Sequence, residues 1–331
     1  MRHTLLFDRS DRARLEITGG AAQATLNGLV TNDVAALRPG HGMYAAALTA
    51  KGKIVADLRI LHVDDHFLLD TSARAAAGLR DMLTKYVNPR FATVRDVSDT
   101  TCQLTVAGAS ATEVIATASG LAAETVAALA PYAQHRATIG DTDALIVRDA
   151  PVGTDALPAY DVIAVAESRD AIAGALASAG AVTANAATWD ALRVESGTPE
   201  WGIDMDDTTL VQEANLDELH AVSYTKGCYI GQETVARVHF RGHVNRMLRR
   251  LQFEEGIVPP AGTALVSETR GAVGEVRSAV RSDHAGAVGI GMVRREVDDG
   301  ERLIARWDGA ETGVVETGVV VVVGKATGAI V

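Results

Sequence analysis

The sequence predicts an α+β protein whose last part is an antiparallel β-barrel. Hydrophobic residues make up 47% of the 331 residues, which is a composition typical of chains that bury a large interior. Helical and strand-like patterns interleave through about residue 200, whereas after Asn245 only short strands separated by glycine or acidic turns recur. A chain of this length exceeds one ordinary core and indicates two or three packed units.

The amino-terminal part combines short strands with two helical stretches. Apolar residues recur at helical spacing in segments 19–37 and 74–86, and residues 51–53 form a turn between two strands. Strand patterns occupy residues 13–17, 43–48, 54–63 and 67–70. These elements define a first α/β part, residues 1–100.

The middle of the chain repeats this mixture and the end does not. Residues 101–244 form a second α/β part, with strands at 104–107, 143–148 and 160–166 and helices at 111–118, 122–130, 169–179 and 189–195. Residues 245–331 carry strands at 247–253, 264–267, 272–280, 287–293, 302–306 and 314–323. Short strands with frequent turns and no helix are typical of a small antiparallel barrel.

Charge and cysteine usage narrow the class of protein. The net charge is −11, from 31 basic and 42 acidic residues, which argues against direct contact with nucleic acid. Cys102 and Cys228 lie far apart, and a chain of this size needs no disulfide, so a reduced cytoplasmic setting is expected. No apolar run approaches the ~20 residues of a membrane span, and the first residues show no signal-peptide pattern.

Segment 223–246 concentrates reactive side chains. Gly227 and Gly231 flank Cys228 and predict a tight turn, while Lys226 and a following helix or strand from Gln232 would favour the thiolate. The alternative is that Cys228 is an ordinary small buried residue. The basic residues that follow suit an anionic ligand or form a solvated face; they are Arg237, His239, Arg241, His243 and Arg246. The two histidines lack an acidic partner, so no metal site is expected.

The run from Lys226 to Glu233 resembles the K-G-C-Y-x-G-Q-E signature of the YgfZ family of folate-binding proteins. Further motifs resemble that family in order: Leu29-Val30-Thr31-Asn32-Asp33, Ala50-Lys51-Gly52-Lys53, Trp189-x-x-Leu192-x-x-Glu195-x-Gly197 and Gln212-Glu213-Ala214-Asn215. The resemblance implies the fold of the glycine-cleavage T-protein, with two α/β parts around a central opening and a carboxyl-terminal barrel. It also implies tetrahydrofolate or a derivative as the ligand.

The resemblance assigns folate contacts to particular residues. Glu195 is expected to accept hydrogen bonds from the pterin and Trp189 to stack on the folate, although a surface carboxylate and core packing are the ordinary alternatives. Tyr44 is a candidate aromatic wall, and equally an ordinary strand residue. Arg237 is the remaining expected folate contact. Asp57 matches one of two paired aspartates in T-proteins; the other position is Ala56, and Arg12 replaces an aromatic folate contact of some relatives.

The resemblance implies an accessory protein that maintains iron–sulfur enzymes and, through them, tRNA modification. In this hypothesis Cys228 is the working thiol, Lys226 is its electrostatic activator, and iron–sulfur enzymes or assembly proteins are the partners. Because such clusters take four protein ligands as a rule, one cysteine alone would not hold one. Three alternatives stay open. One is a folate-dependent aminomethyltransferase or demethylase that uses Asp57, and another is a folate-binding scaffold in which Cys228 only packs. The third is direct tRNA binding through the basic stretch Arg237–Arg250, which the acidic net charge disfavours.

Overall fold

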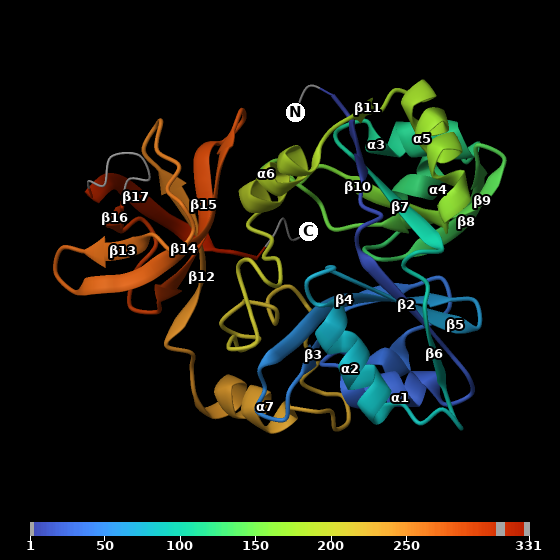
Figure 1. Cartoon of the computed structure of the whole chain (residues 1–331), viewed down its shortest axis with the longest axis horizontal. Coiled ribbons are helices and arrows are strands. Elements are labelled where there is room, and N and C mark those ends of the chain that lie inside the picture. The colour runs from blue at the N-terminus through green and yellow to red at the C-terminus, as the bar shows by residue number, and fades with distance from the viewer. Residues whose placement is uncertain (1–2, 309–314, 328–331) are drawn as a thin grey trace.

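Two sheets and one barrel, each with an apolar core, make up the computed structural model, which describes residues 3–308 and 315–327 (Figure 1). The two sheets stack one above the other, and the barrel stands beside them. This is the predicted arrangement of two α/β parts and a carboxyl-terminal barrel. None of the helices in this described portion combines the length and hydropathy needed to cross a lipid bilayer.

The first sheet is five-stranded and antiparallel. Its order is β3 (Gly42–Leu48), β4 (Ile54–Val63), β5 (His66–Thr71), β2 (Ala13–Thr18) and β6 (Thr93–Asp96). Helices α1 (Ala22–Leu29) and α2 (Ala76–Tyr86) pack their apolar side chains against it. The predicted strands of this part are confirmed.

The predicted helix over residues 19–37 is wrong in its second half. It ends at Leu29, and a short 3₁₀ turn, η1 (Val34–Ala36), follows. Between them Val30 is extended and bridges to Ala47, and the Thr31 amide donates to the Ala46 carbonyl at 2.9 Å. Pairing with β3 therefore satisfies the backbone that a longer helix would have used.

The second sheet has the order β11 (Val182–Thr183), β1 (Leu5–Asp8), β7 (Thr101–Ala107), β10 (Ala159–Val165), β9 (Thr142–Arg148) and β8 (Gln134–Ile139). Its helices are α3 (Ala111–Ser119), α4 (Ala123–Ala127) and α5 (Arg169–Ser178), with a 3₁₀ turn, η2 (Ala166–Ser168). Strand β1 pairs with β7 and β11, so the start of the chain lies in the second sheet. The division into parts 1–100, 101–244 and 245–331 stays a prediction.

The carboxyl-terminal strands close into a barrel, as predicted. The order is β12 (Arg246–Phe253), β15 (Gly286–Arg294), β14 (Gly271–Ser282), β13 (Ala264–Ser267), β16 (Arg302–Asp308) and β17 (Val315–Lys325), and β17 pairs with β12 to close the ring. Residue 314 of the predicted strand 314–323 lies outside the described residues.

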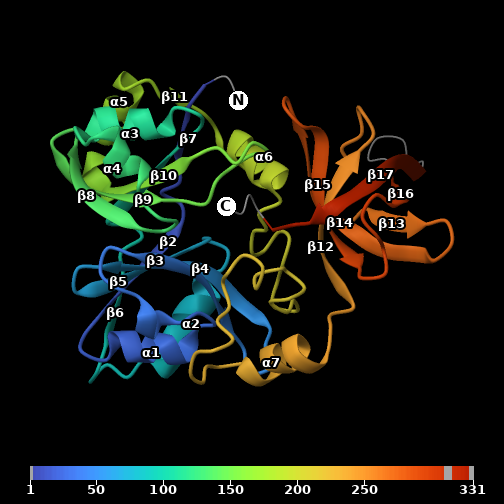
Figure 2. The same cartoon turned by 180° about the vertical axis from the view of Figure 1, so that it is seen from behind.

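Helix α6 (Ala186–Ser196) lies between the second sheet and the barrel in both views (Figures 1 and 2). The Asn185 side chain caps its start by accepting from the Thr188 amide at 2.9 Å, and Gly197 ends it with φ +74°. Residues 198–231 then run without regular helix or strand to α7 (Gln232–Arg241), which leads into β12.

Candidate ligand cavity and signature segment

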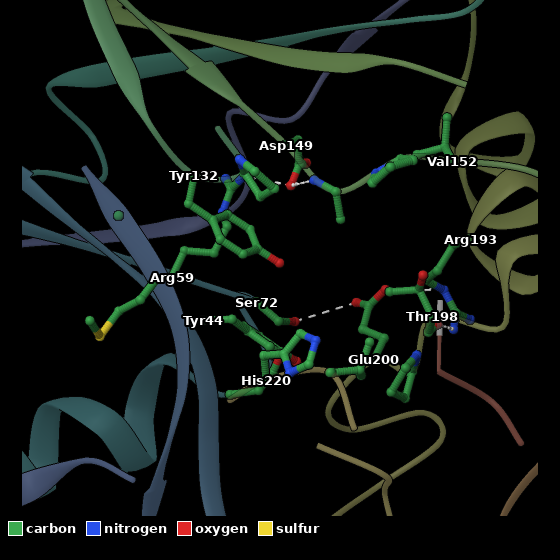
Figure 3. A pocket seen from close by; sticks show the side chains of 18 of the residues that line it. Tyr44, Arg59, Ser72, Tyr132, Asp149, Val152, Arg193, Thr198, Glu200 and His220 are labelled. Carbon is green, nitrogen blue, oxygen red and sulfur yellow. Dashed lines mark hydrogen bonds and ion pairs between the residues drawn. The ribbon is translucent and has the colours of Figure 1, made fainter. Parts of the chain in front are cut away.

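A cavity of about 370 Å³ opens where the first sheet, the second sheet and α6 meet. Strands β3 and β4, loops 131–132 and 149–152, α6 and segments 198–200 and 219–220 each contribute lining residues. Its volume falls within the ~300–1,000 Å³ typical of small-molecule sites. Figure 3 shows Tyr132 and Glu200 projecting into this space from opposite walls.

Asp57 places a partly unsatisfied carboxylate in the cavity wall. It lies on β4 diagonally across from Tyr44 on β3, and the Tyr44 hydroxyl donates to Asp57 Oδ2 at 2.8 Å. No described group hydrogen-bonds to the buried Asp57 Oδ1. Burial raises the pKa of Asp57, against the opposing effects of the Tyr44 hydrogen bond and the nearby Arg12. A ligand that presents an N–H donor here would satisfy this oxygen.

Aromatic side chains form two walls. The rings of Tyr44 and Tyr132 stack with centroids 6.4 Å apart and planes 28° apart. Trp189 of α6 meets the edge of Phe7 at 5.2 Å, and the Arg9 guanidinium lies 4.0 Å from the centroid of its ring. Flat apolar walls of this kind suit a flat heteroaromatic ligand.

A buried ion-pair network forms the floor. Arg59 of β4 pairs with Asp70 at 2.5 Å, Asp161 at 2.6 Å and Asp149 at 3.0 Å. Arg12 also pairs with Asp70, at 2.8 Å. Burial alone would raise the pKa of Asp70, but these two guanidinium groups hold it well below its usual range. Because Asp70 lies in the first sheet and Asp161 in the second, the network ties the two sheets together beneath the cavity.

Glu195 does not reach the cavity. It is buried in the last turn of α6, where its carboxylate accepts a hydrogen bond from the Ser282 hydroxyl of the barrel. Glu200, five residues further on, lines the cavity instead. Its carboxylate lies 3.4 Å from the Ser72 hydroxyl and 3.6 Å from Arg193 Nε, so both contacts are long (Figure 3).

The Lys226 ammonium is held by backbone rather than by a carboxylate. Its Nζ donates to the carbonyl oxygens of Asn27, Val30 and Asn32 at 2.6, 2.8 and 2.7 Å. These carbonyls belong to the last turn of α1 and the segment after it, where helical partners are missing. Burial lowers the pKa of Lys226 to about 8. Cys228, two residues on, is exposed.

Gly231 and Gly52 bring two of the motif segments into contact. Gly231 has φ +84°, and a Cβ added to it would lie 2.6 Å from the Thr49 carbonyl oxygen and 3.2 Å from Gly52 Cα. Only glycine accommodates both the backbone angle and this close approach. The turn at residues 49–53 therefore packs directly under the start of α7.

Asn32 connects the signature segment with the cavity. Its carbonyl accepts from Lys226, and its amide nitrogen donates to the backbone oxygens of Tyr44 and His220, both at 2.8 Å. Asn32, Tyr44 and His220 all line the cavity. In contrast, neither Cys228 nor Lys226 lines it, and Arg237 is exposed on α7 outside it.

The structure thus brings Tyr44, Asp57 and Trp189 to one cavity and leaves Glu195, Arg237, Lys226 and Cys228 out of its lining. Among the lining residues that sequence reasoning missed are Arg9, Tyr132 and Glu200. Of these three, Glu200 had a usable signal, because it lies only three residues beyond the motif that ends at Gly197. Within residues 3–308 and 315–327, no group of three or more His, Cys, Asp or Glu side chains is arranged to hold a metal ion.

Residues 1–225 match the model of the GCVT N-terminal domain family. A tRNA-modifying protein YgfZ from Klebsiella pneumoniae is 31% identical over 90% of this chain and 83% of its own length, and one from Cronobacter sakazakii is 29% identical over 94% and 91%. This chain belongs to the YgfZ and GCVT family. An aminomethyltransferase from Streptomyces avermitilis is 28% identical over 85% of this chain and 75% of its own length.

A solved structure shares the fold of this YgfZ-family chain. The glycine cleavage system aminomethyltransferase T from Bartonella henselae superposes with a TM-score of 0.82, at 21% identity, over 98% of this chain and 86% of that one. The match covers the barrel as well as the amino-terminal domain, as expected for the predicted T-protein-like fold.

Proposed function

We propose that this YgfZ-family chain binds tetrahydrofolate or a derivative in the cavity. It serves, in a cytoplasmic setting, as an accessory protein for iron–sulfur enzymes and, through them, for tRNA modification, with Cys228 as its working thiol. Relatives that bear the name tRNA-modifying protein YgfZ support the role, and the cavity supports the ligand.

The observation that carries the ligand proposal is the unsatisfied, buried Asp57 Oδ1 of a residue that lines the same cavity as Tyr44, Tyr132 and Trp189. A pterin is flat and presents N–H donors, so its ring suits the Tyr44 and Tyr132 wall while its edge supplies the missing donor. Glu200, whose own contacts are long, offers a second acceptor. When bound, the folate would supply a carrier for one-carbon units.

Cys228 is proposed to act outside the cavity. It is exposed on a turn that Lys226 fastens to the end of α1 and that Gly231 presses against residues 49–53. A fixed, accessible thiol suits contact with a partner protein. Since iron–sulfur clusters take four protein ligands as a rule, any cluster contact would need ligands from that partner.

A complementation experiment tests the role of Cys228 separately from folate binding. Cys228→Ala should bind tetrahydrofolate with wild-type affinity, because the side chain does not line the cavity. The same variant should fail to restore iron–sulfur enzyme activity in a strain that lacks its own YgfZ relative. Cys102→Ala is the matched control, since that cysteine is buried in the core of the second sheet. Full complementation by Cys228→Ala would contradict the working-thiol proposal.

A second candidate function is aminomethyl transfer. Asp57 favours it, because burial raises its pKa and one of its oxygens is free to accept a hydrogen bond from a ligand amine. Ala56 replaces the second carboxylate expected of a T-protein, which argues for the accessory role. Activity in a reconstituted glycine-cleavage assay, lost in Asp57→Asn, would establish the enzyme.

A further inference from the structure

Four arginines line the cavity, and three of them are neutralised by carboxylates. Arg12 pairs with Asp70, and Arg59 pairs with Asp70, Asp149 and Asp161. Arg193 pairs with Asp204 at 2.5 Å and also with Asp190. Arg9 differs from all of these.

The Arg9 side chain makes no ion pair and no hydrogen bond with any described residue of the chain. Its contact is with the face of Trp189, 4.0 Å from guanidinium carbon to ring centroid. A cation–π contact of this kind needs no carboxylate partner, and no described acceptor takes a hydrogen bond from the guanidinium N–H groups. The backbone on either side is fixed as well, because the Arg9 amide donates to the Gln103 carbonyl at 2.8 Å.

Arg9 stays charged in these surroundings. Burial lowers the pKa of Arg9 to about 10, with nearby Arg12 acting in the same direction and the charges of Asp161 and Asp149 opposing it, so the side chain is protonated at neutral pH. A partly buried cation without an ion-pair partner is stabilised when an anion arrives to pair with it. A planar guanidinium with free donors matches a carboxylate in bidentate fashion.

We propose that Arg9 receives the carboxylate of the folate glutamate tail, stacked on Trp189 as it does so. This deepens the proposed function and rests on it. Arg237, which the sequence favours for an anionic ligand, lies exposed on α7 outside the cavity lining. In this proposal, the face of the Trp189 ring that packs against Arg9 orients the guanidinium toward the ligand.

The test compares two ligands: tetrahydrofolate, and tetrahydropteroate amide, in which a neutral amide replaces the glutamate tail so that no carboxylate remains. Each is titrated calorimetrically into wild type, Arg9→Gln, Arg9→Lys and the control Arg90→Gln, whose side chain is exposed outside the cavity. A charge-assisted hydrogen bond of ~1.5–3 kcal/mol corresponds to roughly 10- to 100-fold in affinity.

Wild type and Arg90→Gln should bind tetrahydrofolate roughly 10- to 100-fold more tightly than tetrahydropteroate amide. Arg9→Gln should remove this preference by weakening tetrahydrofolate alone, and Arg9→Lys, which keeps the charge but not the fork, should retain part of it. Equal losses for both ligands, or a preference that survives in Arg9→Gln, would overturn the role of Arg9 and leave folate binding intact. Binding of neither ligand by folded wild type would overturn the proposed function itself.

Discussion

Replacing Lys226 with methionine should destabilise the protein by about 3 kcal/mol, because three hydrogen bonds to backbone carbonyls are lost. The net value of one such bond is ~1 kcal/mol, and the side chain is only 8% exposed, so water does not readily replace the ammonium. Methionine keeps the apolar stem and leaves the carbonyls after α1 without this donor. Urea denaturation measures the loss, with the exposed Lys51→Met as the matched control.

The destabilisation caused by Lys226→Met should also depend on pH. Burial lowers the pKa of Lys226 to about 8 in the folded protein, from the 10.5 of a lysine exposed to water. Between these values the unfolded chain binds a proton that the folded chain does not, so folding stability from this group rises with pH across that window. The difference in stability between wild type and Lys226→Met should therefore widen from pH 8 toward pH 10.

The alkylation rate of Cys228 distinguishes two roles for Lys226: positioning the turn or activating the thiolate. If Lys226 holds the turn, Lys226→Met should lower the urea midpoint and leave Cys228 alkylation by iodoacetamide as fast as, or faster than, in wild type. If Lys226 activates the thiolate instead, alkylation should slow while the urea midpoint stays unchanged. An unchanged midpoint with slower alkylation would refute the reasoning from the three carbonyl contacts.

Three further changes test other parts of the structure. Gly231→Ala should destabilise by at least ~2 kcal/mol in urea denaturation, from the left-handed backbone and the close contact at Thr49, whereas Gly227→Ala, with open space around it, should stay within ~1 kcal/mol. Asp70→Asn should cost ~3–5 kcal/mol at neutral pH, because it leaves Arg12 without a carboxylate partner and removes one of the three partners of Arg59. Since the pKa of Asp70 is depressed on folding, that advantage of wild type should shrink as pH falls below ~4 in acid-unfolding curves, and a constant difference would contradict it. Tyr44→Phe removes a hydrogen bond that lowers the pKa of Asp57, so carboxyl NMR should show Asp57 titrating at higher pH than in wild type, and an unchanged titration would contradict this.

Periodicity predicted most of the fold because most elements bury one face. The alternating pattern of residues 54–63 and the valines of residues 318–324 correspond to β4 and β17. Strands β1, β6, β8 and β11 were missed because they are short or lack that alternation. The helix over 19–37 was overextended, because its apolar residues after Leu29 serve the bridge to β3 rather than a helical face.

The sequence predicted only some of the residues that line the cavity. Tyr44, Asp57 and Trp189 were singled out from motifs, and the fold brings them to one cavity. Arg9 and Tyr132 lie in loops without a motif, and only the packing of the two sheets and α6 places them there. Glu195 was singled out by its position in a helical motif, but the barrel supplies Ser282 from 87 residues away and engages its carboxylate.

Calorimetric titration of tetrahydrofolate into wild type, Asp57→Asn and Glu195→Ala tests the central claim most directly. The cavity account predicts that wild type binds, that Asp57→Asn loses most of the affinity, and that a folded Glu195→Ala binds nearly as tightly as wild type. No binding by folded wild type, or a loss confined to Glu195→Ala, would contradict it.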